Sequence, residues 1–318
     1  MKNYEILEYN DKYRDSCIDL LKRVFPGSSD QCTFAWRFDT SEENKPIIVC
    51  AVDAGKVISF NSWIQWKFKY QEKTFTAYQS GESGTDINYR RMGIWEKVIR
   101  LGEKIAIERK IDFFFGFPTP ISFRGFIKAG YQHIGTFDLS LRIINPALFR
   151  TTGVGQKNHQ EFSQTCLLQQ TKITPVVSSE YINWRYHKNP KQYQIITYSE
   201  KSNLLAFVIK QSRYYNKRFK ISFPEIVLLE CCTNCFDRIF LDKAFSHLDR
   251  LFSRKAVWIR TFFSKQTIRG KALSPYFHLH RDAKSAIFIL KKINQELDDN
   301  LLTNFDNWDI FPHVVDSI

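Results

Sequence analysis

One stretch decides the fold of this sequence: Thr85-Asp86-Ile87-Asn88-Tyr89-Arg90-Arg91-Met92-Gly93-Ile94-Trp95. Residues 74–83 before it alternate between apolar and polar side chains, which predicts a strand. Residues 94–109 after it repeat apolar side chains at the spacing of one helix face. The stretch is therefore predicted to be a turn that leads from a strand into an amphipathic helix.

This turn has the chemistry of an anion site. The first backbone N–H groups of a helix have no helical partners and carry partial positive charge, so phosphate binds there readily. Gly93 tolerates unusual dihedrals and lets backbone approach a ligand, while Arg90 and Arg91 add positive charge. A basic helix start without any ligand is the simpler alternative.

The elements around the turn follow a definite order. The patterns predict strands at 4–9, 46–52, 57–70, 74–83, 112–117 and 131–143, and helices at 11–25, 32–38, 94–109 and 120–129. The strands between 46 and 83 form an antiparallel meander because only short turns separate them.

This order and the turn together resemble the GNAT N-acetyltransferase family over residues 4–143. The family's loop has Arg or Gln, two residues, Gly, one residue, then Gly or Ala, directly after a strand. Arg90 and Gly93 match that pattern, and Trp95 departs from it at the last position. Gly130 and Tyr131 match the Gly-Phe or Gly-Tyr pair that precedes the family's last strand.

The resemblance implies an α+β fold with a mixed, mostly antiparallel central sheet flanked by helices. It also implies that acetyl-CoA is a co-substrate, with its pyrophosphate held by backbone N–H groups of the loop. The implied cofactor-binding residues are Ser83, Thr85, Arg90, Arg91, Met92, Gly93, Ile94 and Trp95.

Catalysis in the family is direct attack of an amine on the thioester, and the amine must first lose a proton to a base. Glu82 is our first candidate, because it ends the strand that lines the acetyl group in the family. Asp86 is the second candidate, and His133 has a suitable intrinsic pKa. For each of them a structural role is the alternative.

The family often protonates the leaving thiolate with a tyrosine on the helix after the fifth strand. That position falls near Phe126 in this sequence, and phenylalanine has no proton to donate. Tyr131 is the candidate that replaces it, with Tyr78 as a further possibility. Unassisted departure of the thiolate is the remaining alternative.

The second half repeats the order of elements without an obvious repeat of sequence. We expect domains at 1–144 and 166–318, joined by a linker at 145–165, the second being a degenerate GNAT-like domain. Trp184-Arg185-Tyr186-His187 resembles an element of tandem GNAT-like proteins, and its aromatic residues are expected to anchor a helix on a sheet, stacking on a sugar or base being the alternative. Residues 213–220 are expected to form a basic hairpin turn.

Composition limits the partners. The 46 Lys and Arg exceed the 33 Asp and Glu by 13, so polyanions are attracted, and the phosphates of coenzyme A fit this charge. The basic residues are spread out, which argues against nucleic acid. We expect no signal segment and no membrane span, and we expect a cytoplasmic location because the seven cysteines lack disulfide-like spacing.

Cys231-Cys232-Thr233-Asn234-Cys235 resembles half of a zinc site, but the sequence has no second cysteine pair, so we expect no metal.

The predicted function is transfer of an acetyl group to a small-molecule primary amine. Analogy with related bacterial proteins suggests an amino sugar or its nucleotide-linked form as the acceptor. The alternatives are a non-catalytic coenzyme A sensor and an aminoacyl transferase of the FemABX type. The intact Arg90–Gly93 pattern argues against the latter.

Overall fold

The computed structural model of the chain describes residues 3–26, 30–144 and 171–310. The expected linker at 145–165 lies outside these residues. The first half contains β1 (Tyr4–Glu8), α1 (Arg14–Val24), α2 (Gln31–Phe38), β2 (Ile47–Asp53), β3 (Lys56–Tyr70), β4 (Lys73–Thr85), α3 (Ile94–Glu108), β5 (Phe113–Gly116), α4 (Pro120–Lys128) and β6 (Gln132–Ile143). The order predicted for residues 4–143 is confirmed.

The second half begins with β7, a two-residue strand that the sequence did not indicate. Its elements are β7 (Thr174–Pro175), α6 (Ser179–Ile182) with a π-helical turn at Asn183–His187, β8 (Gln194–Glu200), β9 (Asn203–Asn216), β10 (Ile221–Thr233), α7 (Arg238–Phe252), β11 (Trp258–Phe263), α8 (Ile268–Leu273), β12 (Leu279–Lys292) and α9 (Asp299–Thr303). The expected basic hairpin turn is present between β9 and β10.

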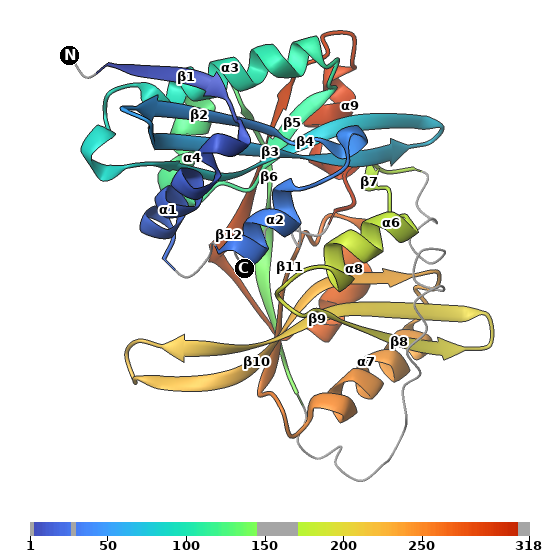
Figure 1. Cartoon of the computed structure of the whole chain (residues 1–318). Coiled ribbons are helices and arrows are strands. Elements are labelled where there is room, and N and C mark those ends of the chain that lie inside the picture. Colours follow the sequence, from blue (N-terminus) through green and yellow to red (C-terminus); the bar gives the residue numbers. More distant parts are fainter. Residues whose placement is uncertain (1–2, 27–29, 145–170, 311–318) are drawn as a thin grey trace.

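All these strands belong to one sheet, in the order β1-β2-β3-β4-β5-β12-β6-β11-β10-β9-β8, with β7 paired to β3. β4 pairs with β5 in parallel, as β10 does with β11. The other pairs are antiparallel. The predicted α+β class, with a mixed and mostly antiparallel sheet flanked by helices, is therefore confirmed (Figure 1).

The C-terminal strand lies inside the first half of the molecule. β12 occupies the place between β5 and β6, and both neighbours pair with it. The beginning of β6 pairs with β12 at 286–290, whereas its end, 138–143, pairs with β11. β6 and β12 thus run from one half to the other (Figure 1). The division at 144 stays a prediction, since the sheet continues across it.

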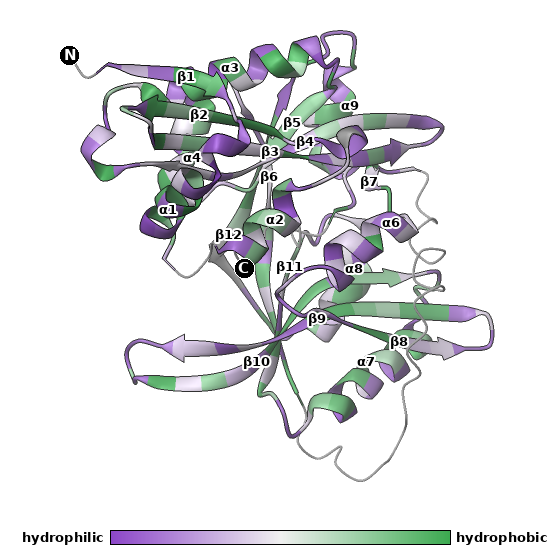
Figure 2. Ribbon diagram, viewed as in Figure 1, coloured by the Kyte–Doolittle hydropathy of each residue, from purple (hydrophilic) through white to green (hydrophobic). Residues whose placement is uncertain are grey.

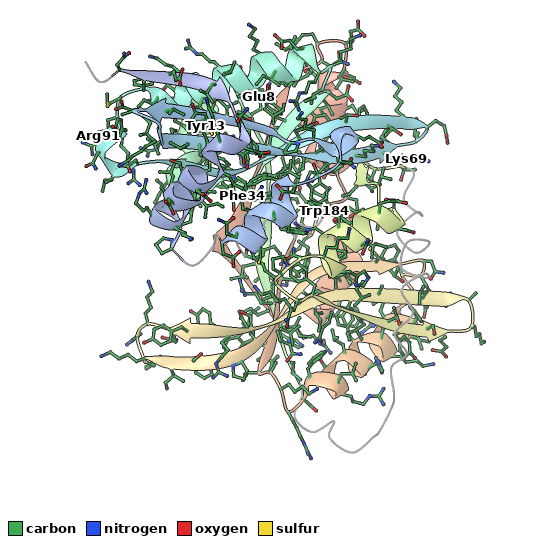
Figure 3. All side chains as sticks on the ribbon, viewed as in Figure 1. Glu8, Tyr13, Phe34, Lys69, Arg91 and Trp184 are labelled. Atoms are coloured by element: carbon green, nitrogen blue, oxygen red, sulfur yellow. The ribbon has the colours of Figure 1, made fainter. Side chains whose placement is uncertain are left out.

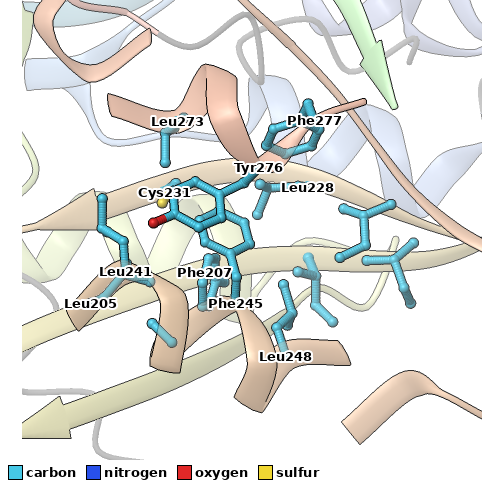
Figure 4. Close-up of a cluster of buried hydrophobic side chains, with 14 of the residues drawn as sticks. Leu205, Phe207, Leu228, Cys231, Leu241, Phe245, Leu248, Leu273, Tyr276 and Phe277 are labelled. Atoms are coloured by element: carbon cyan, nitrogen blue, oxygen red, sulfur yellow. The ribbon is translucent and has the colours of Figure 1, made fainter. Parts of the chain in front are cut away.

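Helices cover both faces of the sheet and enclose separate apolar clusters. α3 packs Val98, Ile99 and Ala106 against β2 and β3, with hydrophilic residues on its outer face (Figure 2). Gly102 permits this approach, because a Cβ there would overlap the Trp63 ring. α1 and α2 cover the opposite face. In the second half, α7 and α8 enclose a cluster around Phe245 (Figure 4).

The two halves also meet through tryptophans. Trp36 of α2 and Trp184 of the π-helical turn stack, with ring centroids 5.3 Å apart and planes inclined by 13°. The Trp36 indole donates to the Trp184 carbonyl at 2.7 Å, and the Trp184 indole donates to the Trp36 carbonyl at 3.1 Å. The Arg185 guanidinium lies 5.8 Å from the Trp36 ring centroid. This segment was expected to anchor a helix on a sheet: Tyr186 lies in a buried cluster with side chains of β9 and β10, whereas Trp184 packs on α2 instead.

No helix of the described residues is long and apolar enough to cross a bilayer.

Truncation of Phe288 tests how strongly β12 ties the sheet together. Phe288 is fully buried, and its ring contacts Phe117 of the β5–α4 segment and Trp308 of the C-terminal region. We expect Phe288→Ala to lower the free energy of unfolding by about 3–5 kcal/mol, the usual cost of truncating a buried phenylalanine to alanine. Urea unfolding followed by tryptophan fluorescence measures this. Ile121→Ala, at a side chain 93% exposed, is the control and should change stability by less than about 0.5 kcal/mol.

Candidate functional site

The site begins where β4 leaves β5. The parallel ladder between them covers only 77–79 of β4 and 113–115 of β5, while β4 continues to Thr85. No described strand pairs with this edge of β4 beyond Gln79. On its other edge, the register with β3 shifts between Gly81 and Gly84, which marks a β-bulge. An extended ligand could hydrogen-bond to the backbone groups along this edge that no described strand pairs with.

Glu82 lies in the bulge, and its φ of +47° is the left-handed conformation. Its carboxylate forms an ion pair with the Arg37 guanidinium of α2. The two side chains are 14% and 7% exposed, so water screens this pair weakly. Arg37 in turn lies 5.6 Å from the ring centroid of Trp36. The carboxylate at the bulge is therefore held in place through α2.

Asp86 follows the bulge and organises the loop. Its carboxylate accepts the N–H of Asn88 at 3.0 Å and pairs with Arg23 of α1 at 3.2 Å. Its own N–H donates to the Ile58 carbonyl at 2.8 Å. Thr85 is fixed beside it, its hydroxyl 2.8 Å from that of Ser59. These contacts set the course of the chain from β4 to α3.

Gly93 is the N-cap of α3, with a φ of +70°, and a Cβ at this position would meet no atom within 4 Å. The first helical hydrogen bond joins the Lys97 N–H to the Gly93 carbonyl, so the N–H groups before Lys97 have no helical acceptor. Arg90, Arg91 and Met92 are exposed around them, and Arg91 lies at the edge of the molecule (Figure 3). Neither arginine is in an ion pair with a described carboxylate.

Trp95 connects the loop to α4. Its indole N–H donates to the Ser83 hydroxyl, and its ring meets Phe126 edge-on with centroids 5.1 Å apart. Gly125 makes room for the indole, because a Cβ there would lie 3.1 Å from it. The neighbouring Ile94 side chain is 1% exposed and packs in the core, so only its backbone can reach a ligand.

Tyr131 is buried beneath the same region. Its hydroxyl accepts the Trp63 indole N–H at 3.3 Å, and its ring lies 5.0 Å from Phe126. Burial raises the pKa of Tyr131 well above that of a free tyrosine, so the hydroxyl keeps its proton. Tyr78 points elsewhere, because its hydroxyl donates to the Lys45 carbonyl near Arg109, at the far end of α3 from the loop.

The sequence reasoning missed two side chains. Arg37 lies 45 residues from Glu82 in the chain, and no local pattern pairs them. Asn61 of β3 is fully buried, and its amide nitrogen donates to the Ser80 hydroxyl at 3.3 Å. Its carbonyl oxygen has no hydrogen-bond partner among the described residues. In the sequence, the polar pair Asn61-Ser62 between apolar neighbours was the pattern that could have indicated a polar group buried in β3.

In the second half, an arginine lies beside a similar bulge. β10 also has a bulge, between Leu228 and Glu230, and it separates from β11 beyond Val227. Arg269 of α8 pairs there with Glu230 at 2.5 Å and with Asp309 at 3.0 Å. Burial raises the pKa of Glu230 to about 7, the nearby guanidinium opposing this.

The cysteines near this bulge differ: Cys231 has a free thiol, whereas Cys232 is in a disulfide bond, which the sequence analysis did not expect. Burial raises the pKa of the Cys231 thiol to about 12, which disfavours the thiolate that a metal needs. Among the described residues, no group of three His, Cys, Asp or Glu side chains could hold a metal ion. His133 lies on the exposed side of β6, where it contacts the Gly135 carbonyl.

The chain resembles known proteins in sequence and in fold. Residues 5–134 match the family model of the acetyltransferase (GNAT) domain. No curated protein sequence matches the chain. A GCN5-related N-acetyltransferase from Anabaena variabilis superposes with a TM-score of 0.65 at 13% identity, over 92% of this chain and 73% of that one. Another from Kribbella flavida gives 0.63 at 10% identity, over 91% and 71%.

The N-myristoyltransferase of Saccharomyces cerevisiae with bound myristoyl-CoA gives a TM-score of 0.57 at 10% identity, over 98% of this chain and 90% of that one. Identities this low show a shared fold alone. The residues that match the family model include β4, the loop after it and α3. The chain therefore has the GNAT fold, and its residues 5–134 match the model of the GNAT acetyltransferase domain.

Proposed function

We propose that this protein transfers an acetyl group from acetyl-CoA to the primary amine of a small molecule. The observation that carries the proposal is the free edge of β4 leading to a helix N-terminus with Gly93 in the left-handed conformation. A pantetheine chain can extend along the first, and a pyrophosphate can accept the N–H groups of the second. The proposed cofactor-binding residues remain Ser83, Thr85, Arg90, Arg91, Met92, Gly93, Ile94 and Trp95.

In the proposed reaction the amine nitrogen attacks the thioester carbon, the C–N bond forms, and the C–S bond breaks. Glu82 accepts the proton that the amine loses, and Tyr131 supplies one to the departing sulfur. Support for Glu82 is its place in the bulge of the free strand edge, with Arg37 fixing the carboxylate. Support for Tyr131 is its protonated hydroxyl near Phe126, where the family's tyrosine would stand.

We further propose that the second half shapes the acceptor side. Trp184 stacks on Trp36, the residue before Arg37, so the second half reaches the candidate base through α2. An amino sugar or its nucleotide-linked form remains the proposed acceptor, by analogy with related proteins. We place the reaction in the cytoplasm and keep domain boundaries at 1–144 and 166–318.

A coenzyme A sensor is the second candidate, because Phe126 replaces the family's usual proton donor. Thermal-shift measurements with acetyl-CoA, coenzyme A and longer acyl-CoAs test binding, and thiol release with a panel of amino sugars, amino acids and polyamines tests transfer. Absence of a shift with every ligand would refute the main proposal. Binding without thiol release would favour the sensor.

We expect Gly93→Glu to abolish the acetyl-CoA thermal shift, since a carboxylate would face the pyrophosphate. Gly55→Glu is a matched control, because Gly55 has a φ of +77° and equally open space in the β2–β3 turn. Both variants should lose about 1–2 kcal/mol of stability from left-handed strain. Isothermal titration should show that only Gly93→Glu loses its affinity for acetyl-CoA. Equal affinities in the two variants would refute the assigned loop.

We expect Glu82→Gln to lower kcat roughly 10²–10⁴-fold, as removal of a general base does, with little change in the Kd of acetyl-CoA. Asp86→Asn, whose amide can still accept the Asn88 N–H, should change kcat far less. Steady-state kinetics at a temperature where both variants are folded compares them. A larger loss of kcat in Asp86→Asn would indicate that Asp86, and not Glu82, is the general base.

Tyr131→Phe should lower kcat roughly 10²-fold or more by removing the proton donor. Tyr78→Phe is its control, since it also deletes a buried hydroxyl and should cost a similar ~1 kcal/mol of stability. Its kcat should stay near that of the parent. Equal activity of both variants and the parent would mean that the thiolate leaves without Tyr131.

A further inference from the structure

One part of the second half extends beyond the sheet. β8 pairs with β9 only up to Ile209, and β11 pairs with β10 only from Glu225. Between these limits β9 and β10 form a two-stranded ribbon that continues to the pair Asn216–Ile221. The ribbon projects from the body as a long arm (Figure 1). We call residues 213–221 the ribbon tip.

The tip is held in a defined shape by its own contacts. At its base, the Tyr214 and Phe223 rings pack on Trp258, with centroids 5.8 and 5.5 Å away. The Asn216 side chain accepts the N–H groups of Arg218 and Phe219 at 3.0 and 3.2 Å, which closes the turn. An isolated ribbon is weak by itself, so this anchoring preforms the surface.

Large apolar side chains are exposed at the tip. Tyr215, Phe219 and Ile221 are 54%, 61% and 50% exposed. In the register of the two strands Tyr215 and Ile221 lie on opposite faces of the ribbon, and Phe219 lies in the turn between the strands, so the exposed apolar groups surround the end of the projection. Hydrophobic groups exposed together mark a surface that contacts a partner or a membrane.

The charge of the tip has one sign. Arg213, Lys217, Arg218 and Lys220 are exposed, and residues 211–224 contain no acidic residue. None of the four forms an ion pair with a described carboxylate; Arg213 instead donates to the Ser222 hydroxyl and carbonyl. The partner of this surface must therefore combine negative charge with an apolar layer.

We infer that the ribbon tip docks on the surface of a bilayer that contains anionic phospholipid. Phe219 and Ile221 enter between the head groups, Tyr215 lies at the interface, and the basic side chains contact lipid phosphates. A single-stranded nucleic acid fits less well, because bases need aromatic faces along a groove and the tip is convex with an aliphatic Ile221. Docking is peripheral and independent of the proposed transfer reaction.

Sedimentation of the full chain with vesicles tests the inference. We expect binding to vesicles of phosphatidylcholine with added phosphatidylglycerol, weakened by salt, and little binding to phosphatidylcholine alone. Lys217→Glu with Arg218→Glu should reduce binding at least ~25-fold, since each basic residue near such a surface contributes about fivefold. Phe219→Ser should also weaken it, leaving the salt dependence in place.

The controls separate a local surface from overall charge. Lys201→Glu changes the charge at the opposite end of β9, and Ile239→Ser removes an apolar side chain 67% exposed on α7. Both should bind vesicles like the parent. Equal losses in control and tip variants, or equal binding to both vesicle types, would overturn the inference. So would binding of a single-stranded oligonucleotide that competes with vesicles and depends on the same tip residues.

Discussion

The placement of β12 between β5 and β6 is the constraint on which the rest depends. Backbone hydrogen bonds on both edges of this strand join the end of the chain to the first half. Lys291 of β12 also binds Glu103 of α3 at 2.5 Å and the Ala129 carbonyl at the end of α4 at 2.6 Å. The C-terminal strand thus orients the two helices that border the loop between β4 and α3, although no residue of β12 belongs to that loop.

The bulged strands β4 and β10 have a similar local geometry but different surroundings. β4 and β10 each have a glutamate as tenth residue, Glu82 and Glu230, and each glutamate pairs with an arginine. Arg37 comes from a peripheral helix and leaves the strand edge free. Arg269 comes from α8 and lies where β10 and β11 separate, which fills the space. The segment between β10 and α7 contains no glycine, whereas Gly93 precedes α3 in the first half.

Local patterns in the sequence were enough for most elements. The helix predicted at 94–109 is found at Ile94–Glu108, because its apolar repeat and Gly93 mark its face and its start. The place of β12, Leu279–Lys292, in the sheet was not predicted. Strand order depends on contacts between distant residues, which leave no local periodicity. The Glu82–Arg37 pair and the unsatisfied Asn61 escaped prediction for the same reason.

Trp95 shows why a departure from a family pattern should be judged together with its neighbours. A small residue at this position would leave space beside β4, and the indole occupies that space without displacing the backbone of α3. Its N–H bonds to Ser83, its ring packs on Phe126, and Gly125 supplies the room. A phenolic hydroxyl in place of Phe126 would need its own hydrogen-bond partner beside this indole. Trp95 and Phe126 thus pack as one unit, and the N–H groups at the start of α3 remain without helical acceptors.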